Sequence, residues 1–357
     1  MADRTCIQAL LVAAAVASGF AAAPGSAVED ELMQRAQEVF QPIPEQPPSL
    51  ADNPITPDKV ELGKMLFFEP RLSESWMLSC NACHNLATGG VDLQETSIGH
   101  GWRKGPRNAP TVLNAAFNIA QFWDGRAKDL EEQATGPMMN PGEMGSSAER
   151  VMGTLRSIPE YGERFERAFP GDANPVSLGN VAKAIAAFEA AALLTPNAPL
   201  DRYLAGDAGS LSEQQKTGLR LFMEKGCVSC HYGTNVGGGR YARFGEVQAP
   251  GADLRSEADK GRFTVTSEPE DEYVFRVAPL RNVALTPPYF HSGKIWELKD
   301  AVAIMGRAQL GLELVQEEVG AIVEFLTSLT GEQPRIVYPV LPVVTSNTPL
   351  PKPYDNP

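Results

Sequence analysis

The segments CNACH, residues 80–84, and CVSCH, residues 227–231, decide how this chain of 357 residues is organised. Each has the pattern C-x-x-C-H, the attachment motif for c-type heme. In such sites two thiols bond to the porphyrin vinyl groups, and the adjacent histidine reaches the iron from one side. The two motifs therefore predict covalent attachment at Cys80, Cys83, Cys227 and Cys230, with His84 and His231 as iron ligands.

The cysteine count leaves two other interpretations open. Cys6 belongs to a predicted export signal, and the remaining four form an even set. In an exported protein such a set commonly forms disulfides, and Cys/His motifs can also bind zinc. Two complete motifs that use every cysteine of the mature chain favour two covalent hemes over two disulfides or one zinc site.

Length and composition predict an exported protein of two domains. The chain is too long for one ordinary core, and its net charge of −13 argues against a nucleic-acid partner. Arg4 is followed by the apolar run ALLVAAAVASGFAAA and small residues, which is typical of a signal peptide over residues 1–27. The run is short for a membrane span and lacks a cationic stop. We therefore expect cleavage, a periplasmic location and no stable membrane insertion, with a retained anchor as the alternative.

Helical signals surround both motifs, whereas strand-like alternation is nearly absent. Thr56 and Pro57 suit the N-cap and first position of a helix, and Ser212 and Gln215 have the spacing of a capping box. Apolar residues recur at helical spacing in segments 179–194 and 316–329. The predicted fold class is all-α, with two cytochrome c-like domains that have long loops and each carry one covalent c-type heme.

The proline-bearing segment LTPNAPL, residues 194–200, is the natural linker. We expect a signal peptide over residues 1–27, a first heme domain over 28–195, a second over 196–333 and an extended tail over 334–357. The tail is proline-rich, and its apolar VLPVV indicates that it is packed, which we expect to be on the first domain.

The ligand on the second side of each heme iron determines whether the heme transfers electrons or activates peroxide. His100 lies between two glycines in SIGHGWRKGPRN, residues 97–108, a loop that could move. Met305 lies toward the end of a predicted helix, where a c-type cytochrome commonly has its axial methionine. Each also has a structural interpretation, because lone histidines are commonly structural and methionine fills gaps in cores. The residues alone predict two unequal hemes and do not choose between an enzyme and an electron carrier.

A resemblance narrows this choice. The stretch MLSCNACHNLATGGVDLQETSIGHGWRKGPRN and its continuation through NPGEMG, residues 77–145, resembles the first-heme domain of the bacterial di-heme cytochrome c peroxidases. RVAPLRNVALTPPYFHSGKIWELKDAVAIMGRAQLG, residues 276–311, is similar to the end of their second domain. The resemblance covers essentially the whole mature chain. It implies an oxidoreductase that reduces hydrogen peroxide to water with electrons from a small periplasmic cytochrome c or cupredoxin, usually as a homodimer.

The resemblance also implies unequal roles for the hemes. The first would be the low-potential, peroxidatic center, with His84 as proximal ligand and His100 as a distal ligand. His100 would leave when the second heme is reduced, and glycines on both sides suit such a hinge. The second would be the high-potential center that receives electrons, with His231 and Met305 as ligands.

Further residues take roles from the same resemblance. Glu143 matches the catalytic acid–base residue, and Gln133 matches a pocket residue that positions peroxide or water. Phe122 and Trp123 match aromatic residues near the peroxidatic heme, with Trp123 between the hemes as an electron bridge.

A calcium ion at the domain interface is implied as well. Its ligands would be the Asn108 side chain and the backbone carbonyls of Thr286 and Pro288, an oxygen-only set that suits a hard cation. For His291 we expect a contact with a propionate or with the interface.

Two other functions remain open at this point. The chain could be a di-heme electron carrier without peroxidase activity, which Glu143, Gln133 and His100 speak against. It could instead oxidise a protein or an organic substrate. Relatives that mature a tryptophan-derived quinone have tyrosine at the place of Met305, so the methionine speaks against that version.

Overall fold

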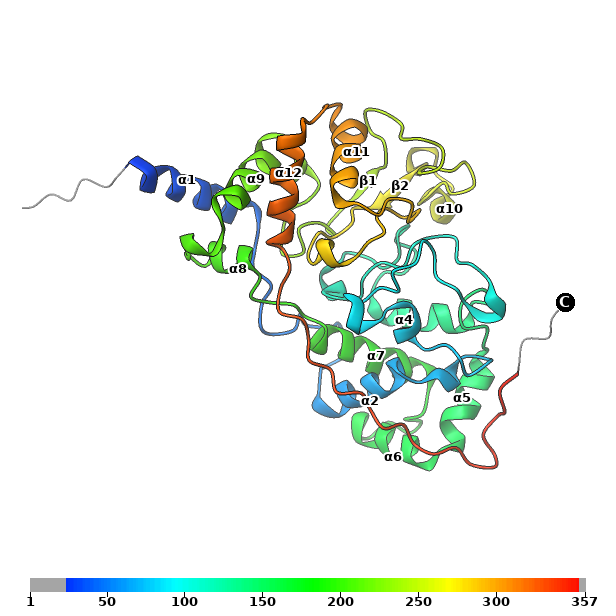
Figure 1. The fold of residues 1–357 in the computed structure, drawn as a ribbon. Helices are drawn as coiled ribbons and strands as arrows, with labels where there is room; N and C mark the ends of the chain where they lie inside the picture. Colours follow the sequence, from blue (N-terminus) through cyan, green and yellow to red (C-terminus); the bar gives the residue numbers. More distant parts are fainter. Residues whose placement is uncertain (1–23, 353–357) are drawn as a thin grey trace, which may run out of the picture.

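The structure, a computed structural model, describes residues 24–352 and is mostly helical (Figure 1). The α-helices are α1 (Pro24–Val39), α2 (Pro57–Phe67), α3 (Cys80–Cys83), α4 (Leu130–Met139), α5 (Ala148–Ser157), α6 (Pro159–Ala168), α7 (Leu178–Ala192), α8 (Pro199–Leu204), α9 (Glu213–Glu224), α10 (Phe263–Thr266), α11 (Leu298–Leu310) and α12 (Gln316–Thr327). Two short strands, β1 (Tyr241–Arg243) and β2 (Val274–Arg276), pair antiparallel. The mostly helical prediction is confirmed.

Short 3-10 helices lie in the loops between these elements. They are η1 (Pro70–Leu72), η2 (Leu86–Thr88), η3 (His100–Trp102), η4 (Ala115–Phe117), η5 (Ala208–Ser210), η6 (Cys227–Ser229), η7 (Pro269–Asp271) and η8 (Val283–Leu285). No helix within residues 24–352 is long and apolar enough to cross a membrane. The predicted signal peptide lies, for residues 1–23, outside the described part of the chain.

Local sequence signals explain where the main helices begin. The Thr56 hydroxyl accepts a hydrogen bond from Lys59 N at 3.3 Å and caps α2, and Pro57 occupies the first turn. Ser212 and Gln215 exchange the two hydrogen bonds of a capping box at the start of α9. Both predicted helix starts are confirmed, and Met305 lies on α11 as expected.

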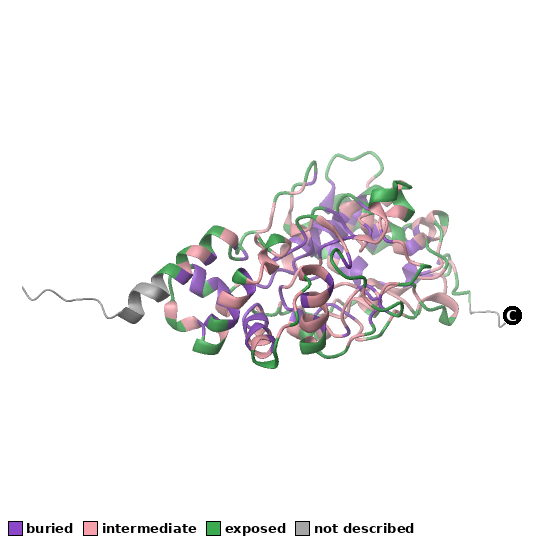
Figure 2. Ribbon diagram, turned by 90° about the horizontal axis from the view of Figure 1, so that it is seen from above, coloured by how far each residue is buried: buried purple, intermediate pink, exposed green. Residues whose placement is uncertain are grey.

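The chain builds two large hydrophobic cores. One is formed mainly by α2, α4, α5, α6 and α7, and the other by α1, α8, α9 and α12. Helix α1 precedes the first core in the sequence, yet Leu32, Ala36 and Phe40 pack into the second. Figure 2 shows the buried residues along the inside of both halves and the exposed residues around them.

Each core is centered on a pair of helices that cross in contact at a glycine. A Cβ atom on Gly63 of α2 would lie 1.9 Å from the carbonyl oxygen of Ala184 on α7. A Cβ atom on Gly218 of α9 would lie 1.8 Å from the carbonyl oxygen of Ala321 on α12. Only glycine permits these approaches. The repetition shows that α2 with α7 and α9 with α12 are equivalent pairs, a duplication that the sequence analysis did not identify.

The duplication extends to the segments that join the halves. RNAPTVLN, residues 107–114, and RVAPLRN, residues 276–282, end in Asn114 and Asn282, which share a left-handed backbone with φ of 57° and 62°. Both side-chain amides donate to the hydroxyl of Thr195, at 2.7 and 2.9 Å. All three residues have no exposed surface. We call this group the Thr195 clasp. Its shared acceptor, Thr195, lies in the proline-bearing segment between the cores, and this segment is largely buried.

The C-terminal segment runs back along the first core (Figure 1, red). The Tyr338 ring lies 4.8 Å from that of Phe68, and Leu341 packs against the first core. Arg71 donates from Nη1 to the carbonyl oxygen of Pro342 at 2.7 Å. The segment is therefore attached by both apolar and polar contacts, without secondary structure of its own.

Replacement of Thr195 tests the clasp. Thr195→Val keeps the shape of the side chain but leaves two buried asparagine amides without their acceptor. We expect the free energy of unfolding to fall by about 2 to 4 kcal/mol. Urea denaturation of the loaded protein measures it, and Thr195→Ser, which keeps the hydroxyl, serves as the matched control. Equal stability of the valine and serine variants would contradict this assignment.

Candidate functional site

The second C-x-x-C-H motif opens onto a large cavity between α9, α11 and the segment 275–291. The cavity is partly open to solvent. Most of its wall is apolar. Nine residues singled out from the sequence line it: Asn108, Trp123, Cys227, Cys230, His231, Thr286, Pro288, His291 and Met305. Both thiols, the histidine and the methionine proposed for the second heme thus face one space.

The environment of His231 suits an iron ligand. Its Nδ1 lies 3.4 Å from the carbonyl oxygen of Val236, a contact that leaves Nε2 to face the cavity when Nδ1 carries the proton. Burial lowers the pKa of His231 to about 4, so the imidazole is neutral at pH 7. The neutral ring is the form that binds a metal.

Arg276 provides a test of whether a heme fits this cavity. Its side chain lies in the cavity wall and is 2% exposed. Its Nε donates to the carbonyl oxygen of Phe122 at 3.3 Å, and among the described residues its buried Nη1 has no hydrogen-bond partner. Burial lowers its pKa to about 10, because no acid offsets the desolvation of the charge. A heme propionate is an anion that would satisfy this guanidinium, so the cavity and its residues fit a c-type heme.

The first motif forms α3 and places its cysteines in the first half. His84 follows directly, with its N–H donating to the carbonyl oxygen of Cys80 at 2.9 Å. Burial lowers the pKa of His84, as for His231. Burial raises the pKa of Cys80 to about 12 and that of Cys83 to about 11, so both thiols are protonated. None of the four motif cysteines forms a disulfide.

Glu189 is a buried carboxyl beside the first motif that the sequence analysis missed. It lies on α7, is 5% exposed, and burial raises its pKa to about 8. The negative charge of ionised Glu189 also raises the pKa of Cys80. The equivalent helix crossings place Glu189 where the second half has Leu326, which lines the second cavity. Alignment of the two halves of the sequence would have revealed this exchange of a leucine for an acid.

The loop that carries His100 meets the segment that carries Glu143. His100 lies in η3, and its N–H donates to the carbonyl oxygen of Glu143 at 2.6 Å. The Nε2 atom of His100 lies 3.5 Å from the carboxylate of Glu74, just upstream of the first motif. The adjacent Gly101 has a φ of 68°, a left-handed backbone that glycine adopts readily.

Glu143 has the environment of a proton-transfer group. Burial raises its pKa, while the charge of Arg126 and a hydrogen bond from Asn140 at 2.7 Å oppose the shift. The Arg126 guanidinium lies 3.5 Å from the center of the Phe122 ring. The charge of Glu143 also raises the pKa of the Cys83 thiol. The structure thus groups Glu143, Arg126 and Phe122 near the first motif, and it places Gln133 half-buried on α4.

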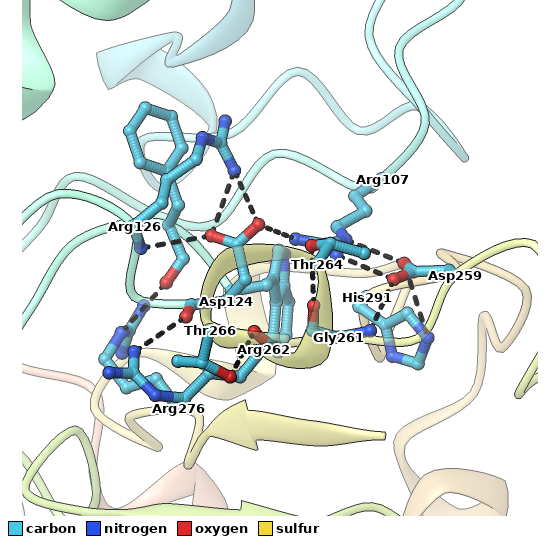
Figure 3. Close-up of polar contacts among 12 residues, drawn as sticks. Arg107, Asp124, Arg126, Asp259, Gly261, Arg262, Thr264, Thr266, Arg276 and His291 are labelled. Atoms are coloured by element: carbon cyan, nitrogen blue, oxygen red, sulfur yellow. Dashed lines mark hydrogen bonds and ion pairs between the residues drawn. The ribbon is translucent and has the colours of Figure 1, made fainter. Parts of the chain in front are cut away.

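Charged residues join the two halves through a set of polar contacts (Figure 3). Arg107 donates from Nε and Nη2 to the carboxylate of Asp259, at 2.7 and 2.6 Å, and from Nη1 to Asp124 at 2.6 Å. Arg107 belongs to the first half and to the loop of His100, whereas Asp259 belongs to the second. This partly buried network links the loop of His100 directly to the second half.

Aromatic rings lie beside this network. The indole N–H of Trp123 donates to the carbonyl oxygen of Asn108 at 2.9 Å. Its ring lies edge-on to His291, with centroids 6.2 Å apart. His291 stacks on Phe275 at 4.1 Å and lies 4.0 Å from Asp259 (Figure 3). Burial lowers the pKa of His291 to about 4. His291 therefore makes an interface contact, and Trp123 lies where the two halves meet.

The proposed calcium ligands line the wall of the second cavity. The Asn108 amide nitrogen donates to the carbonyl oxygen of Gln94 at 2.9 Å, which leaves Oδ1 to accept or to ligate. Thr286 and Pro288 lie on the same wall. Within the described residues, no group of three or more His, Cys, Asp or Glu side chains is arranged to hold a metal ion. The three candidates would act through amide and carbonyl oxygens instead.

Comparisons with known proteins agree with this architecture. The family model described as Di-haem cytochrome c peroxidase matches residues 57–209. A cytochrome c551 peroxidase from Pseudomonas aeruginosa is 59% identical over 322 residues, which cover 90% of this chain and 93% of that protein. A cytochrome c551 peroxidase from Nitrosomonas europaea is 47% identical, with 90% and 92% covered.

A solved structure shows the same fold. It is a MauG-like protein associated with microbial copper homeostasis, with a TM-score of 0.72 and 29% identity over 81% of this chain and 94% of that one. The two relatives each match 90% of this chain. The chain therefore belongs to the di-haem cytochrome c peroxidase family.

Proposed function

We propose that this protein is a di-heme cytochrome c peroxidase that reduces hydrogen peroxide to water with electrons from a small donor protein. The observation that carries the proposal is the cavity that Cys227, Cys230, His231 and Met305 line together. The equivalent first half carries the other complete motif, at residues 80–84. Relatives that match 90% of the chain are named cytochrome c551 peroxidases.

The two cores would each hold one covalent heme, with the division near residues 195 and 196. Cys80 and Cys83 would attach the first heme, and Cys227 and Cys230 the second. When bound, the hemes supply iron centers that accept and pass on single electrons and, on the first, reduce peroxide. The chain itself attaches the hemes, sets their relative potentials, opens one iron and moves protons.

Buried charge supports a direction for electron flow. The cation of Arg276 in the second cavity favours the reduced form of a heme there. The carboxyl of Glu189 beside the first motif favours the oxidised form when it is ionised. Met305 as an axial ligand also raises the potential of the second heme. These differences between equivalent positions support a high-potential second heme that passes electrons to the first, with Trp123 between them.

Replacement of Arg276 tests this electrostatic argument. We expect Arg276→Gln to lower the reduction potential of the second heme, because a buried positive charge near the propionates is lost. Potentiometric titration followed optically measures both hemes in one experiment. Arg335→Gln, an exposed arginine on the C-terminal segment, controls for net charge. An unchanged potential for the second heme would count against the role of Arg276.

The peroxide chemistry needs a group that takes a proton from one oxygen and gives it to the other. Glu143 suits this task, since burial raises its pKa toward neutral pH. Arg126 holds a positive charge nearby, and Gln133 would position peroxide or water. His100 would occupy the distal side of the first iron at rest and leave before peroxide binds.

We expect Glu143→Gln to lower kcat/KM for peroxide by about 10² to 10⁴-fold, because the amide cannot accept the proton. Steady-state oxidation of a reduced small cytochrome c measures the loss, and optical spectra confirm that both hemes remain attached. Glu163→Gln, an exposed acid on α6, is the matched control. Full activity of the Glu143 variant would remove this residue from the mechanism.

A calcium ion is part of the proposal. Asn108, Thr286 and Pro288 would bind it, and Asn108 belongs to the loop of His100. We expect that chelation of Ca²⁺ slows the opening of the first heme and that added Ca²⁺ restores the rate. Stopped-flow spectroscopy of the half-reduced protein measures this rate, and Asn108→Ala should imitate chelation. An identical rate with and without Ca²⁺ would exclude this coupling.

The donor would be a small cytochrome c or cupredoxin in the periplasm, and the enzyme would act as a homodimer. The net charge of −13 favours a donor with a basic patch and an association rate that falls as ionic strength rises.

A further inference from the structure

The position of His100 raises the question of what holds it there. Its ring lies against Gly145, where an added Cβ atom would be 2.7 Å from two ring carbons. Gly145 also has a φ of 65°, so both its backbone and its lack of a side chain make room for the ring. Together with the hydrogen bond from the His100 N–H to Glu143, this forms a defined seat for the histidine.

The carboxylate of Glu74 lies next to the His100 ring in this position. Oε2 of Glu74 lies 3.5 Å from Nε2 of His100. Nε2 is the ring nitrogen farther from the backbone, and we take it as the atom of His100 that would bind the iron. While Nε2 faces Glu74, the same atom cannot bind an iron. The side chain of Glu74 is 25% exposed, so it is shielded on most sides.

Glu74 is itself held in place by its backbone. Its N–H donates to the carbonyl oxygen of Met144 at 3.0 Å, and its carbonyl oxygen accepts from Arg150 Nη2 at 3.1 Å. Met144 is next to Glu143, so the same segment positions both the seat and the carboxylate. Glu74 is therefore a fixed partner and not a mobile surface acid.

The end of the C-terminal segment completes the arrangement. Lys352 donates from its backbone N–H to the carbonyl oxygen of Glu74 at 2.9 Å, and its ammonium lies 3.1 Å from Glu74 Oε1. The two carboxylate oxygens thus face different partners, Oε1 the lysine and Oε2 the histidine. Figure 1 shows this segment crossing the first half past α6 and ending near α5.

We propose that Glu74 is a positioning residue that receives His100 when it leaves the first heme iron and holds it in the released position. This inference rests on the proposed role of His100 as a releasable ligand. Glu74 biases the balance between the closed and the open iron toward the open side. An ion pair or hydrogen bond at a partly exposed site shifts such a balance by about two- to fivefold, and less in high salt.

The test uses the full-length protein with both hemes loaded and the second heme reduced. EPR and optical spectra give the ratio of open, high-spin to closed, low-spin ferric iron at the first heme. Fluoride, which binds only an open ferric iron, gives an independent value. We expect Glu74→Ala to lower the open ratio about two- to fivefold at low salt and to weaken fluoride binding by the same factor.

Matched variants separate the contact from general effects. Glu160→Ala removes an exposed acid on α6 of the same half that pairs with Arg164, and it should leave the ratio unchanged. Lys352→Ala should keep the ratio at or above that of the parent protein, because the lysine competes for the same carboxylate. A parent-like ratio in Glu74→Ala, or an equal loss in Lys352→Ala, would overturn the proposal.

One more variant distinguishes this proposal from the proposed function. His100→Ala should give an open first heme at every potential. If its spectra match those of the parent protein, His100 is not the distal ligand, and both its release and its capture by Glu74 are excluded. If His100→Ala is open but Glu74→Ala is unaltered, only the role of Glu74 is excluded.

Discussion

The hydroxyl of Thr195 accepts hydrogen bonds from Asn114 and Asn282, and this buried clasp sets how the two halves of the chain meet. Each asparagine ends one copy of a repeated segment, and the same two segments begin with Arg107 and Arg276. Because the asparagines share one acceptor, the segments cannot move apart without breaking buried hydrogen bonds. The walls of the second cavity and the contact between Trp123 and His291 depend on that fixed approach.

Duplication supplies two equivalent frames, and the differences between them support unequal functions. Arg107, seven residues before Asn114, is neutralised by Asp124 and Asp259, whereas Arg276, six residues before Asn282, is buried without an acid. Glu189 occupies the place that Leu326 has in the other half. In a low-dielectric interior such exchanges of charge act strongly on any redox center nearby. The proposed direction of electron flow is thus a property of a few buried side chains on a shared backbone.

The same contacts give the loop of His100 two sets of neighbours. At one end, Arg107 ties the loop to Asp259 of the second half. In its middle, His100 contacts Glu143 and Glu74 of the first half. A change in the second half can therefore reach the proposed distal ligand through one short segment. The C-terminal segment reaches the same point through Lys352, although more than 250 residues of sequence separate it from Glu74.

The sequence by itself determined the two heme-attachment motifs and the local helices. The motifs at 80–84 and 227–231, the caps at Thr56 and Ser212, and the helix that carries Met305 are all encoded by short-range patterns, because thiol spacing and capping act between neighbours. Only the tertiary structure decided which distant groups meet. The partners of Glu74, the unpaired charge of Arg276, the burial of Glu189 and the Thr195 clasp depend on contacts between residues 26 to 278 positions apart. Such contacts leave no periodic signal in one sequence, since they are set by how two duplicated cores pack against each other.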